Sequence, residues 1–182
     1  MGASDIPPGP KRSFPKTVYV VVEAAKGSRN VYRYDEDLGV LVLERVLSST
    51  YACPADYGFV PQTLCEDGEK LRCFLLTLEP VVPGALVPSK PAGVLNVRGE
   101  KFKKRLLLAV PSEEVDPRFA RVESLVDVPS HFLAEIKAFA SQIDARRFVK
   151  WAKIDAVDGC EDAKKLVLEA HRQYQRSVDA LD

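Results

Sequence analysis

The first 110 residues alternate short apolar runs with turn sequences, and this alternation constrains the fold more than any other feature of the chain. Glycine, proline and aspartate mark the turns, and the runs between them are rich in β-branched residues. Five runs have the length and composition of strands: 18–22, 40–43, 73–78, 93–97 and 106–110. Strands this short and this closely spaced predict a small closed antiparallel β-barrel of five strands, similar to an OB-fold.

Beyond residue 129 the apolar residues recur at helical spacing. Apolar side chains at 132, 136, 139 and 143 follow Pro129, a residue suited to the first turn of a helix. A second amphipathic stretch covers 161–178, with apolar residues on one face and charges on the other. Strands followed by helices predict an α+β fold in which two main helices pack outside the barrel.

Length and composition place these elements in one domain. A chain of 182 residues with 46% hydrophobic and 29% charged residues is ordinary for one globular domain, which we assign to residues 16–182. Residues 1–15 contain four prolines and no apolar core. We expect them to form a flexible arm rather than a secretory signal or a transit helix.

Charge and cysteine content bear on the binding partners and on the cellular compartment of the chain. With 26 basic and 26 acidic residues the chain has no net charge, which gives no sign of a nucleic-acid or membrane partner. No apolar run approaches the roughly 18–20 residues that span a bilayer. The four cysteines lack the spacing of a zinc site, so we expect reduced thiols. We therefore expect an intracellular protein of the cytosol or of an organelle matrix such as the mitochondrial one.

An ordered series of short motifs connects the chain with a known family. Arg45 leads into CPADYGF at 53–59, and EDGEKLR follows at 66–72. PAGVL at 91–95, LAVP at 108–111 and KWAK at 150–153 complete the series. In this order, over about residues 17–178, the motifs resemble those of the family I soluble inorganic pyrophosphatases, whose signature is Asp-Gly-Asp-Pro-x-Asp. The resemblance implies the pyrophosphatase fold, which agrees with the barrel and outer helices expected above.

The resemblance also implies a reaction, the hydrolysis of diphosphate by several magnesium ions held in a cluster of acids. By position, five vestiges of that site remain. One is an acid on the first strand, two bind phosphate, and two are the first acids of the signature: Glu23, Arg45, Tyr57, Asp67 and Glu69. In an active enzyme Asp67 and Glu69 would hold magnesium. The alternative for each vestige is a purely structural role, since Tyr-Gly and Asp-Gly also make good turns.

The losses outnumber the vestiges. Carried over by position, the substituted site residues are Val31, Arg33, Cys53, Lys70, Arg72, Arg98, Lys104, Leu106, Ile143 and Asp144. Among them, Arg33, Arg72, Arg98 and Lys104 put a cation where the family has an acid. An arginine repels a neighbouring divalent ion, so we expect no catalytic residue, no bound metal and no cofactor, with magnesium required only if the protein is active.

Three functions stay open at this point. The first is a pseudoenzyme that serves as a structural subunit of a larger assembly or homo-oligomer, with residues 1–15 ordered by a neighbouring chain. The second is a module that binds an anion or RNA backbone through a basic cleft formed by seven cations: Arg33, Arg45, Lys70, Arg72, Arg98, Lys103 and Lys104. RNA binding usually also needs exposed aromatic residues, and Phe102 is the one aromatic near these cations. The third is an active magnesium-dependent pyrophosphatase with a rebuilt acid cluster: Asp35, Glu36, Asp37 and Glu44.

Overall fold

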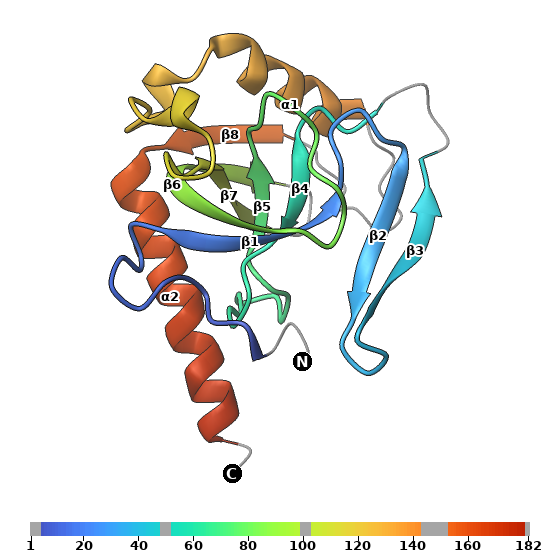
Figure 1. Cartoon of the computed structure of the whole chain (residues 1–182), viewed down its shortest axis with the longest axis vertical. Coiled ribbons are helices and arrows are strands. Elements are labelled where there is room, and N and C mark those ends of the chain that lie inside the picture. Colours follow the sequence, from blue (N-terminus) through green and yellow to red (C-terminus); the bar gives the residue numbers. More distant parts are fainter. Residues whose placement is uncertain (1–4, 48–51, 99–102, 143–152, 181–182) are drawn as a thin grey trace.

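A ring of five strands forms the centre of the computed structural model, which describes residues 5–47, 52–98, 103–142 and 153–180 (Figure 1). In spatial order the ring contains β1 (Val18–Ala24), β4 (Asp56–Phe59), β5 (Arg72–Leu75), β7 (Lys103–Pro111) and β6 (Leu86–Arg98). Pairing of β6 back onto β1 closes the ring, as the sequence predicted. One pair departs from the antiparallel expectation: β5 and β7 are parallel, because β6 lies between them in the chain and reverses its direction.

The composition of the ring differs from the expectation at one strand. The apolar run at 40–43 belongs to β3 (Val40–Val46), which pairs with β2 (Asn30–Asp35) in a separate two-stranded sheet. The fifth ring strand is β4, whose Tyr57-Gly58 has the composition of a turn. Gly58 lies there because β1 passes very close: a Cβ at this position would be 1.9 Å from the carbonyl oxygen of Val21.

Strand β6 pairs with β7 along one edge and is long enough to pair with two further strands in succession along the other. Its first residues pair with β1, and its last residues, from Val94 to Arg98, pair with β8 (Lys153–Asp158). The sequence predicted only the part from Gly93 onward, because Pro88 and Pro91 interrupt the strand pattern before it. The two prolines fit because β6 bends where it passes from one neighbour to the other.

The two predicted helices lie outside the ring on different sides (Figure 1). Helix α1 (Ser130–Gln142) contributes Phe132, Ile136 and Phe139 to one buried cluster. Helix α2 (Cys160–Asp179) contributes Ala163, Leu166, Val167 and Ala170 to the other. Short 3-10 turns at Pro117–Phe119 and Leu125–Asp127 connect β7 to α1. Among the described residues, no helix is both long and apolar enough to cross a bilayer.

The N-terminal arm lies against its own chain from residue 5 onward, while its flexibility and its ordering by a neighbouring chain stay predictions. Pro8 and Gly9 are buried, and the carbonyl oxygen of Pro8 accepts a hydrogen bond from the Tyr19 amide at 2.8 Å. Phe14 packs against the α2 cluster, with its ring 5.5 Å from that of His171. Burial of Pro8 and the packing of Phe14 favour this position, and a proline-rich segment has less backbone entropy to lose on ordering. Residues 1–4 lie outside the described range.

Candidate functional site

Glu23 on β1 is a buried carboxylate with two partners. Its side chain is 5% exposed, and its carboxylate accepts hydrogen bonds from the Arg72 guanidinium and from the Tyr34 amide, the latter at 2.9 Å. Arg72 opens β5, and β4 alone separates that strand from β1 in the ring. The fold therefore places the cation at 72 directly on the first vestigial acid.

Arg72 also contacts a second vestigial acid. Its guanidinium lies 3.5 Å from the carboxylate of Glu69, and its side chain is only 18% exposed. Burial by itself would lower the pKa of Arg72, but the neighbouring Tyr57, Glu23 and Glu69 raise that pKa overall. The group therefore stays charged and serves as a shared counter-ion for the two carboxylates.

The third of these acids, Asp67, forms a second ion pair, with Lys104. The Lys104 ammonium on β7 lies 2.9 Å from the Asp67 carboxylate, and its side chain is 15% exposed. Burial acts to raise the pKa of Asp67, yet the hydrogen bond from Lys104 and the Glu69 amide outweigh it and lower the pKa. Each of the three vestigial acids Glu23, Asp67 and Glu69 thus contacts a cation of this chain.

The two residues expected to bind phosphate are both at least partly buried. Tyr57 on β4 is buried with its ring 5.0 Å from that of Phe74, and burial raises the pKa of its hydroxyl. Arg45 lies on β3 opposite Val31 of β2, and two of its guanidinium nitrogens are buried. Cys53, at the first loop tyrosine, donates to the carbonyl oxygen of Ala55, and burial raises its pKa to about 12.

The remaining substituted positions divide between core and surface. Val31 and Leu106 are core residues. Arg33 lies on the β2–β3 hairpin, where it contacts Asp35 at 3.2 Å and Glu44 at 3.9 Å. Lys70 pairs with Glu36 and lies 4.3 Å from the centre of the Phe59 ring. Ile143 and Asp144 lie outside the described residues.

The acids proposed for a rebuilt site do not gather. Asp35, Glu36 and Glu44 are paired with Arg33 or Lys70, and the Asp37 amide donates to Asp35. Within the described ranges, no three His, Cys, Asp or Glu side chains are grouped so that they could hold a metal ion. Magnesium prefers carboxylate and water oxygens, so a site whose three acids already bind arginine and lysine does not fit it.

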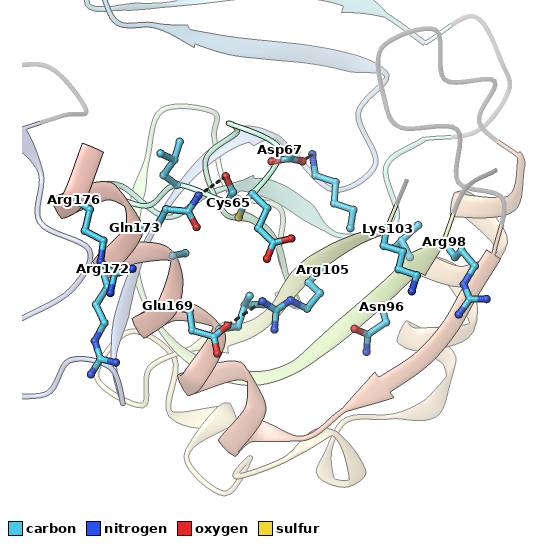
Figure 2. Close-up of a pocket in the computed structure, with 16 residues that line it drawn as sticks. Cys65, Asp67, Asn96, Arg98, Lys103, Arg105, Glu169, Arg172, Gln173 and Arg176 are labelled. Carbon is cyan, nitrogen blue, oxygen red and sulfur yellow. Dashed lines mark hydrogen bonds and ion pairs between the residues drawn. The ribbon is translucent and has the colours of Figure 1, made fainter. Parts of the chain in front are cut away.

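Six of the seven cations of the expected basic cleft separate into two groups, and the seventh, Arg45, lies on β3. Arg33, Lys70 and Arg72 contact acids beside the hairpin and the ring, while three others line a cleft of about 770 Å³ beside α2 (Figure 2): Arg98, Lys103 and Lys104. Arg105, Arg172 and Arg176 also line this cleft and were missed from the sequence. The four-residue spacing of the last two on one helix was the available signal.

Asp56 is a second residue whose role the sequence did not reveal. It is fully buried on β4, and its carboxylate accepts hydrogen bonds from the Lys26 amide at 2.7 Å, the Val81 amide at 3.2 Å and the Thr77 hydroxyl. These partners lie in loops on both sides of the strand. Asp56 therefore ties the loop after β1 to the loop after β5, which is a structural task.

Comparison with known proteins places the chain in one family. The inorganic pyrophosphatase family model matches residues 20–175. An inorganic pyrophosphatase of Aquifex pyrophilus is 33% identical over 176 residues, which cover 97% of this chain and 98% of the relative. Soluble inorganic pyrophosphatase 2 of Chlamydomonas reinhardtii is 36% identical, covering 94% and 86%. The crystal structure of inorganic pyrophosphatase from Thermus thermophilus, 33% identical, matches with a TM-score of 0.87 over 96% of this chain and 99% of that one. The chain belongs to the inorganic pyrophosphatase family.

Proposed function

We propose that this chain is a member of the pyrophosphatase family that no longer hydrolyses diphosphate with magnesium and that serves as a subunit of a larger assembly. One observation carries the first half of this proposal: the Arg72 guanidinium contacts both Glu23 and Glu69, where the family would hold a metal ion. The free cysteines at 53, 65, 73 and 160 fit a reducing compartment, the cytosol or an organelle matrix.

Electrostatics explains why Arg72 and magnesium exclude one another. Two unit charges 4 Å apart interact by about 4 kcal/mol at an effective dielectric constant of 20, so a divalent ion and an arginine repel each other by about 8 kcal/mol. Moving Arg72 aside would relieve this repulsion but would leave the buried Glu23 without its cation. Lys104 adds a second repulsion at Asp67.

Diphosphate hydrolysis with magnesium is the second candidate function. The names of the relatives favour it over a non-catalytic role, because the similar proteins of bacteria, archaea and an alga are all named inorganic pyrophosphatases. In that case Asp67 and Glu69 would hold magnesium after Lys104 and Arg72 had moved away. The two candidates give opposite results in one assay.

We expect the purified protein to release phosphate from diphosphate and magnesium no faster than a mock purification. The Aquifex pyrophilus relative, measured in parallel, serves as the positive control. Any activity found should be remeasured in the variant with Asp67→Asn and Glu69→Gln. Turnover that disappears in this variant belongs to the chain and overturns the proposal, whereas turnover that persists belongs to a contaminant.

The outer edge of the β2–β3 hairpin supports the second half of the proposal. In the described part of the chain β3 pairs only with β2, so its other edge carries unpaired backbone groups. Four large apolar residues there are about half exposed or more: Leu38, Val40, Leu43 and Val46. β3 has no lysine or proline, and its charged residues are Glu44 and Arg45 near its end, so the apolar residues 40–43 are suited to accept an extended segment of a partner protein as an added strand.

The native protein is therefore expected to purify with a mass well above that of its 20.1 kDa chain. Replacing Val40 and Leu43 with lysine should release the monomer, because two charges on the edge block strand pairing. Val126→Lys is the control, since Val126 is 91% exposed but lies far from the hairpin in sequence, on a 3-10 turn. Light scattering after size exclusion measures the masses. A native monomer, or equal dissociation in the control, contradicts the assignment.

A further inference from the structure

The cleft beside α2 has a positive lining although the whole chain is neutral. Of the described residues, six cations and three acids line it, and the cations come from three separate elements, β6, β7 and α2. The six are Arg98, Lys103, Lys104, Arg105, Arg172 and Arg176. A concave surface lined by one sign of charge concentrates ions of the opposite sign.

Ion pairs inside the cleft neutralise only some of these cations. Lys104 neutralises Asp67, and Arg105 neutralises Glu169 at 2.9 Å across the gap between β7 and α2. No acid of the described residues pairs with Lys103, Arg172 or Arg176. Figure 2 places Arg172 and Arg176 at one end of the cleft and Lys103 at the other, with the Arg105–Glu169 pair between them. An elongated anion could therefore contact both ends.

The size and floor of the cleft indicate a small molecule. Its volume of about 770 Å³ lies in the range of small-molecule sites, roughly 300–1,000 Å³. Leu64, Val97 and Leu166 supply apolar surface, which suits a carbon skeleton between charged groups. Among the described residues the lining contains no aromatic side chain, so this part of the cleft lacks the stacking surface that single-stranded nucleic acid uses.

We propose that the cleft between α2 and the β6–β7 hairpin binds a small molecule that carries a chain of phosphate groups, with Lys103, Arg172 and Arg176 as its main contacts. This site goes beyond the proposed function, because it needs neither magnesium nor hydrolysis. Lys104 and Asp67 are among its lining residues, so the ion pair between them forms part of its wall.

Calorimetric titration with ATP in EDTA and low salt tests the proposal, and inorganic tripolyphosphate is titrated in parallel. Binding of both is expected, with Arg172→Glu plus Arg176→Glu weakening it about tenfold or more, because two charge-assisted contacts become repulsive. The control pair Lys137→Glu plus Lys165→Glu makes the same change of net charge outside the cleft and should leave binding within about twofold. Arg172→Gln plus Arg176→Gln, a milder pair, provides a second test should the reversal unfold the helix.

Each result decides the proposal. ATP that binds more tightly than tripolyphosphate supports it and adds a contact of the apolar floor with the nucleoside, while equal binding supports recognition of the phosphate chain alone. Absence of binding at 1 mM of either probe overturns the proposal. So does equal weakening in the control pair, which indicates only bulk charge. A single-stranded oligonucleotide that binds more tightly than ATP also overturns it, since the surface is then one for nucleic acid.

Discussion

Replacing Arg72 with methionine is expected to lower the free energy of unfolding by about 3–5 kcal/mol. The reason is the environment of Glu23, whose side chain is 5% exposed and whose main cationic partner is Arg72. Removing that partner leaves a buried carboxylate without a counter-charge, and such a loss is among the largest effects of a single substitution. Urea unfolding at neutral pH, followed by circular dichroism, measures the change.

Two further variants separate this explanation from a loss of packing. Arg72→Met combined with Glu23→Gln removes both charges and should recover most of the lost stability, because a neutral amide is far less costly to bury. Arg33→Met removes an exposed arginine with an acidic neighbour, and should change stability by about 0–1 kcal/mol. Equal destabilisation in the single and double variants would mean that the charges of Glu23 and Arg72 are not coupled.

Gly58→Ala is expected to destabilise the fold by more than about 4 kcal/mol and to leave little folded protein at 37 °C. A Cβ at residue 58 would lie 1.9 Å from the Val21 carbonyl oxygen and 3.0 Å from the Val22 Cα, both in the backbone of β1. Backbone atoms of a closed ring cannot move aside without breaking the β1–β4 pairing.

The matched control is Gly159→Ala, where a Cβ would meet no atom within 4 Å. Gly159 precedes α2 as its N-cap, so alanine there should reduce stability by only about 1 kcal/mol. Thermal unfolding of the two variants measures the difference. A Gly58→Ala protein that melts within a few degrees of the parent would show that β1 and β4 can separate at this position.

Local patterns were sufficient to predict the elements that bury one clear face. Both helices and four of the five ring strands follow from apolar periodicity, which reports burial directly. Strand β4 was missed because the sequence Tyr57-Gly58 is typical of a turn. Glycine is needed at position 58 because the backbone of Val21, which is distant in sequence, would lie 1.9 Å from a Cβ there. The assignment of 40–43 to the ring failed for a related reason, since an apolar run does not tell which sheet it joins.

The site divides in the same way. The sequence alone predicted that Arg72 and Lys104 replace acids of the family with cations, but it did not predict which acids these two residues contact. Glu23 is 49 residues from Arg72, and only the order of the strands brings the two together. Arg172 and Arg176 lie outside the family motifs, so the resemblance did not point to them. Helix α2 shares the cleft with the β6–β7 hairpin only after the chain has folded.

On the proposed loss of metal binding, the contacts of Arg72 make a return to it difficult to reach one mutation at a time. Arg72→Asp, the first step towards an acid cluster, would place a third carboxylate beside Glu23 and Glu69 and remove their shared cation. Three like charges at such distances repel one another by about 4 kcal/mol per pair until a metal ion arrives. Lys104→Asp would do the same beside Asp67. A variant with only one of these changes is therefore expected to be less stable than both the present protein and one with a complete metal site. The ion pairs thus oppose the stepwise recovery of metal binding.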